Sequence, residues 1–305
     1  MKKLLIFMLC ALTLGGCARQ KDEETVRVGV CLPSTAVPYR QVLVGELENA
    51  GYYVNLLDGK NDQSYQNRQV AQLVREQYDL LVIEPVIRAA TDGLLVGLDE
   101  ADIPAVLLNA PEQPARAARQ VCWVWFSEEQ AGTLQGQCIL HTPDRGDRNG
   151  DGQVTCAVLA GPEDLVNTSI HRNACLDALA DAGISVQLLG QVFGDDTISR
   201  GQALTEGLLD RFGDQIEVLF CGNGQLALGA LAALEAAGKT VNEDVYLVSI
   251  GGGPELLRRI EAGAMTGAVM KDYDAMAIQV TQAAQALLTG RPAPQLHASY
   301  ILKKA

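Results

Sequence analysis

The chain has 305 residues, of which 48% are apolar, enough for two lobes with their own cores and too many for a disordered protein. Its formal net charge is −13, and no block of Lys and Arg residues stands out. Both facts argue against a nucleic-acid partner, whose phosphates would be repelled, and they suit an exported folded protein.

Residues 1–17 have the pattern of a lipoprotein signal peptide. The basic start Met1-Lys2-Lys3 precedes an apolar run from Leu4 to Leu14 that is too short for a permanent membrane span. The next residues, Gly15-Gly16-Cys17, complete a likeness to a bacterial lipobox. We expect cleavage before Cys17, lipidation of its thiol, a polar tether over residues 18–24, and a location in the cell envelope on the outer face of the cytoplasmic membrane. An ordinary signal peptide of a periplasmic protein is the alternative.

From Val26 onward, strand patterns alternate with amphipathic helical patterns. The expected strands are Val26–Leu32, Tyr53–Leu57, Leu80–Ile83, Ala105–Leu108, Val121–Val124, Val154–Leu159, Ser185–Leu189, Glu217–Cys221, Val245–Ile250 and Thr266–Met270. The expected helices are Val37–Ala50, Ser64–Gln77, Ala90–Ala101, Glu128–Ile139, Thr168–Ala182, Ile198–Phe212, Gln225–Ala237, Pro254–Ala262 and Tyr273–Leu288. This repeat predicts an α/β fold of two Rossmann-like lobes with parallel sheets.

Six of the eight cysteines remain once Cys10 is removed with the signal and Cys17 carries lipid. The six are Cys31, Cys122, Cys138, Cys156, Cys175 and Cys221. They lie in apolar strand runs or on helical faces, which favours small buried thiols over disulfides. The sequence leaves their redox state open.

Residues 147–155 read Asp-Arg-Asn-Gly-Asp-Gly-Gln-Val-Thr and match the first nine positions of a calcium loop. The expected ligands are Asp147, Asn149, Asp151, Gln153 through its carbonyl, and Thr155. Gly152 stands where the loop turns sharply. Position twelve is Val158, which has no carboxylate, so the ion needs a ligand from elsewhere in the chain. An acidic turn without metal is the alternative.

Four stretches carry a resemblance to a known family. They are residues 61–70 (NDQSYQNRQV), the calcium segment, Ile216-Glu217-Val218 followed by Asn223, and residues 262–269 (AGAMTGAV). Through them the chain resembles periplasmic sugar-binding proteins of the galactose/glucose-binding type. The resemblance implies that Glu217 completes the calcium cage, and family members have a glutamine where Thr155 stands here.

The same resemblance implies how the lobes are assembled. The first lobe comprises residues 25–126 plus 271–292, and the second comprises 127–270 plus 293–305, so that the chain crosses between them three times. The segment from His297 to Leu302 is expected in the second lobe. Ligands gather at the carboxyl ends of parallel strands, which places the binding site between the lobes.

Six residues are carried over as candidate ligand-binding positions. They are Tyr39, Glu84, Asn167, Arg172, Asn223 and Lys271. A one-residue uncertainty leaves His171 as the alternative to Arg172. Trp123 and Trp125 lie at the first crossing, where one is a candidate stacking face and at least one is expected in the core.

The chain departs from the family pattern at Val37, Glu84, Asp195 and Gly251, where an aspartate, an asparagine, an aromatic residue and an aspartate are usual. Lys271 also replaces an asparagine. We expect a ligand with a charge or an altered hydroxyl pattern, such as an acidic or amino sugar. The alternative is a neutral sugar surrounded by side chains that pair with one another.

The sequence has no recognisable catalytic motif, since its glycine clusters read as turns and its histidines are scattered. We therefore predict a binding protein rather than an enzyme. The predicted role is the solute-binding component of an ABC importer, which delivers a small polar ligand to a membrane permease. A sensor that presents its closed form to a chemoreceptor or a sensor kinase is the alternative.

Overall fold

The computed structural model describes residues 25–109, 120–162, 166–291 and 296–305. The expected signal peptide, the tether and the lipidated Cys17 lie outside these residues. No helix in the described ranges is both long and apolar enough to cross a membrane.

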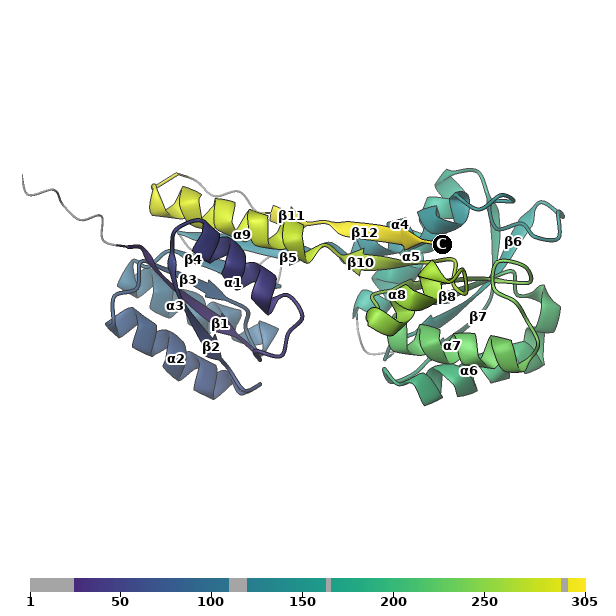
Figure 1. The fold of residues 1–305 in the computed structure, drawn as a ribbon, viewed down its shortest axis with the longest axis horizontal. Coiled ribbons are helices and arrows are strands. Elements are labelled where there is room, and N and C mark those ends of the chain that lie inside the picture. The colour runs from purple at the N-terminus through teal and green to yellow at the C-terminus, as the bar shows by residue number, and fades with distance from the viewer. Residues whose placement is uncertain (1–24, 110–119, 163–165, 292–295) are drawn as a thin grey trace, which may run out of the picture.

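Two six-stranded sheets organise the described chain (Figure 1). The strands are β1 (Arg27–Leu32), β2 (Tyr53–Asp58), β3 (Leu80–Ile83), β4 (Ala105–Leu108), β5 (Val121–Phe126), β6 (Gln153–Ala160), β7 (Ser185–Phe193), β8 (Val218–Cys221), β9 (Tyr246–Ile250), β10 (Gly267–Lys271), β11 (Leu296–Ala298) and β12 (Tyr300–Lys304). Their order is β11-β5-β4-β3-β1-β2 in one sheet and β12-β10-β9-β8-β6-β7 in the other. Among the described residues, all pairings of these strands are parallel except β10 with β12, so the predicted α/β fold is confirmed.

Helices cover both sheets. They are α1 (Arg40–Asn49), α2 (Gln63–Arg75), α3 (Thr91–Ala101), α4 (Glu128–Leu140), α5 (Val166–Asp181), α6 (Ile198–Phe212), α7 (Gly224–Ala236), α8 (Pro254–Glu261) and α9 (Tyr273–Leu288), with short 3-10 turns at Arg88–Ala90 and Gly213–Gln215. Side chains at the first residue before several helices accept a backbone N–H and fix where the helix starts, as Asp62 does for α2 and Ser127 for α4. The two lobes lie side by side along the long axis in Figure 1, and α9 packs on α1, β4 and β5 of the first lobe.

The chain crosses between the lobes at three places: after Phe126, after Lys271 and at Ser299. The expected assignment of residues 293–305 to the second lobe is therefore wrong for Leu296–Ala298. These residues form β11, which pairs in parallel with Val124–Phe126 of β5 in the first sheet. Ala298 is fully buried in the first-lobe core, whereas Tyr300–Lys304 pair with β10 of the second sheet.

All six cysteines in the described residues are free and buried, which confirms their interpretation as small buried thiols. Burial raises the pKa of Cys31, Cys122, Cys138 and Cys156 to about 12. These thiols are therefore protonated and weakly nucleophilic at neutral pH.

Glycines set the spacing of the helix pairs in the second lobe. A Cβ on Gly136 of α4 would lie 2.5 Å from the Cys175 carbonyl oxygen of α5, and one on Gly229 of α7 would lie 2.1 Å from the Ile198 carbonyl oxygen of α6. Because the neighbouring atoms belong to the backbone, they cannot rotate away. Both helix pairs therefore require glycine at these contacts.

We predict that Gly136→Ala lowers the free energy of unfolding by about 1–3 kcal/mol, because the added methyl group forces α4 and α5 apart. The matched control is Gly97→Ala on α3, where a Cβ meets nothing within 4 Å. That change stabilises by about 0.5–1 kcal/mol through helix propensity. Urea unfolding measures both, and equal stabilisation by the two changes would contradict the close helix contact.

Candidate functional site

Polar side chains meet where the carboxyl ends of the first-lobe strands β3 and β4 approach that of β10, the second-lobe strand that leads into the second crossing. Glu84 follows β3, and both of its carboxylate oxygens accept hydrogen bonds. The Tyr39 hydroxyl, just before α1, donates to Oε2. The Asn109 amide, just after β4, donates to Oε1 over 2.8 Å. Lys271 ends β10 close enough to influence this carboxylate electrostatically. The structure thus brings together the three predicted residues Tyr39, Glu84 and Lys271.

Burial raises the pKa of the Glu84 carboxyl above its ordinary value of 4.5. The hydrogen bond from Asn109 and the charges of Lys271 and Arg88 act in the opposite direction and do not cancel this effect. A raised pKa means that the folded lobe favours the protonated form of Glu84. The ionised group is held here at a cost in stability.

An aromatic cluster lies beneath these polar groups and contains one residue from each crossing. The Phe126 ring lies 5.9 Å from Tyr273 and 5.3 Å from Tyr300, both edge-on. Tyr273 also lies 5.5 Å from Tyr39. The Lys271 ammonium lies 5.0 Å from the centroid of the Phe126 ring. The cluster thus links the three crossings to the Glu84 site.

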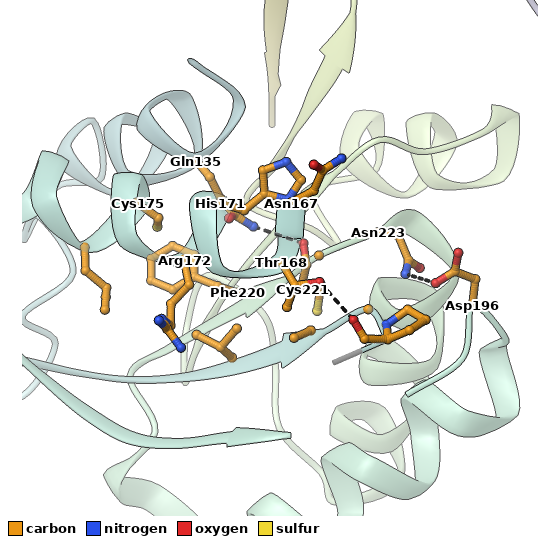
Figure 2. Close-up of a pocket in the computed structure, with 16 residues that line it drawn as sticks. Gln135, Asn167, Thr168, His171, Arg172, Cys175, Asp196, Phe220, Cys221 and Asn223 are labelled. Carbon is orange, nitrogen blue, oxygen red and sulfur yellow. Dashed lines mark hydrogen bonds between the residues drawn. The ribbon is translucent and has the colours of Figure 1, made fainter. Parts of the chain in front are cut away.

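The second lobe contributes a pocket of about 160 Å³ at the carboxyl ends of β6 and β8 (Figure 2). Three predicted residues line it, namely Asn167, Arg172 and Asn223. Asn223 caps α7, since its Oδ1 accepts the Leu226 N–H over 2.9 Å, and its amide nitrogen donates to Asp196 over 2.7 Å. Its amide is therefore already engaged, and any ligand here would meet Asn223 and Asp196 as a pair.

His171 and Arg172 point to different sides of α5 in Figure 2. The Arg172 guanidinium donates to Gln191 over 2.6 Å and to Asn173, so it is held against β7. The His171 Nε2 lies 2.5 Å from Glu128 Oε2, at the first crossing. Of the two alternatives, His171 is the one that contacts a residue next to the first crossing.

Residues of both lobes line a second pocket of about 630 Å³. Arg88 and Trp125 come from the first lobe, Phe126 and Glu128 from either side of the crossing, and Asn167 from the second lobe. Glu128 has a lowered pKa: its own burial acts to raise it, but the hydrogen bond and charge of His171 and the charges of Lys271 and Arg88 outweigh burial. This interlobe pocket is large enough for a monosaccharide and is bordered by charged groups.

Both tryptophans at the crossing belong to the first-lobe core, with exposures of 5% for Trp123 and 4% for Trp125. The expectation that at least one packs in the core is confirmed. Trp125 also stacks on His297 at 4.2 Å and borders the interlobe pocket.

The positions that depart from the family pattern supply few polar groups. Val37 packs against the first-lobe core. Asp195 is exposed, and its carboxylate lies 3.2 Å from the Thr197 hydroxyl. Gly251 has φ 69°, and a Cβ there would meet nothing within 4 Å. Gly253 is equally open, whereas a Cβ on Gly252 would lie 2.8 Å from the Leu256 side chain.

Sequence reasoning missed Asn109, Glu128 and Tyr273. A signal for the first two existed, because Asn109 directly follows a predicted strand and Glu128 begins the predicted helix after the first crossing. Tyr273 follows the second crossing, yet its contact with Tyr39 joins segments more than 200 residues apart in sequence. No local pattern predicts such a pairing.

The predicted calcium segment folds into a tight loop around its own acidic side chains. Asp147 accepts backbone N–H groups of Gly150, Asp151 and Gly152 over 2.9–3.1 Å. Asn149 accepts the Asp151 N–H over 2.8 Å. Gly150 and Gly152 have φ of 74° and 87°, which glycine adopts without strain. The side chains are thus held in place by the loop backbone.

Glu217 reaches this loop although it lies about sixty positions further along the chain. Glu217 is only 3% exposed. Oε1 accepts the N–H groups of Arg148 and Asn149 over 2.8 and 3.0 Å, and Oε2 accepts the Thr155 N–H over 2.8 Å. The Thr155 hydroxyl lies 2.9 Å from Oε2 and also contacts the Gln215 carbonyl. Glu217 therefore binds the backbone of this loop from the neighbouring strand end.

These donors fit a hard cation of the calcium type, which prefers several oxygen ligands. Within the described ranges, no three side chains of His, Cys, Asp and Glu form a metal site by themselves. A cage here would need Asn149 and the Gln153 carbonyl as well as the carboxylates. The Thr155 hydroxyl contacts Glu217 and the Gln215 carbonyl. Thr155 is therefore placed to orient the Glu217 carboxylate rather than to act as a ligand itself.

Two parallel α/β lobes joined by three crossings, with polar groups at the facing strand ends, define a bilobal binding protein. Residues 28–292 match the family model described as periplasmic binding protein domain. The chain therefore belongs to the periplasmic binding protein family, and the resemblance drawn from the sequence is confirmed.

Individual relatives agree with this assignment. The chain is 25% identical to the D-galactose/methyl-galactoside binding periplasmic protein of Haemophilus influenzae, over 97% of this chain and 92% of that protein. It is 22% identical to the ribose import binding protein of Bacillus subtilis, over 89% of this chain and 84% of that protein.

Solved structures share the fold. A periplasmic ribose ABC transporter structure from Conexibacter woesei has a TM-score of 0.74 at 18% identity and covers 91% of each chain. A Caulobacter myo-inositol binding protein has a TM-score of 0.69 at 19% identity, over 93% of this chain and 94% of that one. At these identities the likeness concerns the fold alone.

The raised pKa of Glu84 gives a prediction with a definite sign. Because the folded state binds this proton more tightly than the unfolded state, the stability associated with Glu84 is greatest at acid pH and is lost as pH rises above about 4.5. Glu84→Gln carries no charge at any pH. The melting temperature of the variant relative to wild type therefore rises between pH 4 and pH 7.

Glu48→Gln, an exposed change in the same lobe, is the control and leaves this difference flat. Differential scanning calorimetry at the two pH values measures the effect. A Glu84→Gln difference that falls between pH 4 and pH 7 would show that the ionised carboxylate is favoured instead.

Proposed function

We propose that this chain is the solute-binding component of an ABC importer, and that it binds a monosaccharide or a related small polar ligand between its lobes. One observation carries the proposal: polar clusters stand at the carboxyl ends of strands in both lobes, and residues of both lobes, Asn167 among them, line one pocket. Relatives named for galactose and for ribose import support a sugar as ligand.

Binding proceeds by closure of the lobes around the ligand. The open and closed forms exchange, and the ligand shifts the population because it contacts both lobes only in the closed form. Tyr39, Glu84 and Lys271 supply the first-lobe contacts. Asn167 and His171 supply second-lobe contacts, and the Asn223–Asp196 pair extends them. The protein binds and releases its ligand without catalysing a reaction, and the closed form delivers the ligand to a membrane permease.

The envelope location follows from the family and from the signal pattern of residues 1–17. Lipidation of Cys17 would anchor the protein on the outer face of the cytoplasmic membrane, with several acyl chains holding durably. The tether 18–24 would then separate the lobes from the lipid surface.

The calcium loop serves stability in this proposal and takes no part in binding the sugar. Asp147, Asn149, Asp151, the Gln153 carbonyl and Glu217 would hold the ion, and Thr155 would orient Glu217. The ion supplies positive charge that balances the carboxylates at the base of the second lobe. The support for this calcium site is that Asp147 and Glu217 both bind the backbone of the same loop.

We predict that Glu217→Gln abolishes the rise in melting temperature that calcium produces. At calcium 100-fold above its Kd the ion adds about 2.7 kcal/mol to the stability of wild type. The amide also has one acceptor oxygen in place of two, so the variant is less stable than wild type even in chelator. Differential scanning fluorimetry with calcium and with EDTA separates the two effects.

Glu261→Gln, exposed at the end of α8, is the matched control and keeps the full calcium response. Wild-type protein that melts at one temperature in calcium and in EDTA would remove the metal from the proposal.

The ligand-binding proposal predicts that protein stripped of ligand by unfolding and refolding is stabilised by at least one member of a panel of sugars and inositol. His171→Ala then weakens binding of that compound at least tenfold, because it removes a group facing the other lobe. His141→Ala, whose Nδ1 contacts only the Gln137 carbonyl at the far end of α4, leaves binding unchanged. Isothermal titration calorimetry gives the affinities, and a loss of affinity equal in both variants would argue against a site at His171.

A further inference from the structure

Lys271 stands out among the charged groups near the crossings because its ammonium forms no ion pair with any described residue. It is the last residue of β10 and lies at the second crossing. In the described part of the chain its ammonium makes no hydrogen bond and no ion pair, and it contacts the face of Phe126, which borders the interlobe pocket. A cation held at an aromatic face is partly desolvated, which costs free energy unless an anion compensates it.

The carboxylates nearby are already engaged within the protein. Both oxygens of Glu84 accept hydrogen bonds, from Tyr39 and Asn109. Glu128 is bound by His171 at 2.5 Å. Lys271 and these carboxylates interact electrostatically, but no ion pair joins them among the described residues.

Two further carboxylates at this edge also have internal partners. Asp272, next in sequence to Lys271, caps α9 by accepting the Ala275 N–H over 2.9 Å. In the second lobe, Asp196 accepts the amide of Asn223. Lys271 therefore remains the cation whose charge the neighbouring described residues leave unmatched.

The turn after the strand next to Lys271 has no side chains. The neighbouring strand β9 ends at Ile250 and is followed by Gly251, Gly252 and Gly253. A Cβ on Gly251 or on Gly253 would meet nothing within 4 Å. Gly251 stays at this edge of the sheet, since its N–H donates to the Val269 carbonyl of β10 over 2.7 Å. No side chain of this turn fills the region that a ligand group near Lys271 would need.

We propose that the ligand is a sugar acid whose carboxylate binds the Lys271 ammonium in the closed form. This inference rests on the proposed function and adds the chemical class of the ligand. One ammonium balances the single charge of a carboxylate, and the resulting hydrogen bond is charge-assisted and stronger than one between neutral groups. The hydroxyl groups of the ring then meet Glu84, Asn167 and His171, as in the proposed site. A phosphate, with nearly two charges, would call for a second unmatched cation.

The test is calorimetric titration of the ligand-stripped mature chain with six compounds. These are D-galacturonate, D-glucuronate, D-galactose, D-glucose, D-glucosamine and D-glucose 6-phosphate. We expect one of the uronates to bind at least tenfold more tightly than its neutral parent sugar. Lys271→Gln abolishes that preference, so that the uronate binds the variant no more tightly than its neutral parent sugar does, because the charge-assisted hydrogen bond is lost.

Lys303→Gln is the matched control, since it removes an exposed lysine from the neighbouring strand β12 and keeps the uronate preference. Raising the salt concentration weakens uronate binding to wild type and has little effect on Lys271→Gln, because only the first includes an ionic contact.

Three outcomes would overturn the inference while leaving a sugar-binding protein in place. They are equal affinity for the uronates and the neutral sugars, tightest binding of glucosamine or of glucose 6-phosphate, and an undiminished uronate preference in Lys271→Gln. If none of these compounds and no other sugar or inositol binds, the proposed function itself fails, and the inference fails with it.

Discussion

The packing of Phe126, Tyr273 and Tyr300 holds the three crossings together, and the arrangement of the two lobes depends on it. Each ring comes from a different crossing, and all three belong to or border one apolar cluster that also contains Val269 of the second sheet. A single connection would let the lobes tumble, whereas three connections converging on one cluster favour a bending motion. The hinge is therefore a small piece of core shared by both lobes.

This shared core places the polar groups where a ligand could meet them. Because every sheet pairing near the crossings is parallel except that of β10 with β12, the carboxyl ends of the strands in both lobes lie at the hinge side. Glu84 stands on the first-lobe side, Lys271 at the second crossing, and His171 and Asn223 on the second-lobe side. The predicted calcium loop lies at the opposite, amino-terminal end of β6, away from these residues.

Local sequence patterns predicted most of the fold, because alternating strands and helices leave periodic signals. The strand β11 escaped them, since three residues are too few for a period and its partner β5 lies about 170 positions earlier. The sequence alone also could not decide between His171 and Arg172. One residue along a helix turns a side chain by about 100°, so an error of one position exchanges the two sides of α5.

Glu217 illustrates a different limit. The loop sequence showed that a carboxylate was missing at Val158, but only the resemblance to a family indicated which residue supplies it. The structure explains why, since β6 and β8 are neighbours in the sheet although about sixty residues separate them in sequence. In the same way, the engagement of Glu84 by Tyr39 and Asn109 follows from the tertiary arrangement of strand ends.

The central claim is that two lobes close on a ligand held between them. Small-angle X-ray scattering of the ligand-stripped chain, before and after saturation with a sugar shown by calorimetry to bind, tests it directly. A smaller radius of gyration in the saturated sample, from bending at the three crossings, is the expected result. Tight binding with an unchanged radius of gyration would contradict the account, because it would place the ligand on one lobe alone.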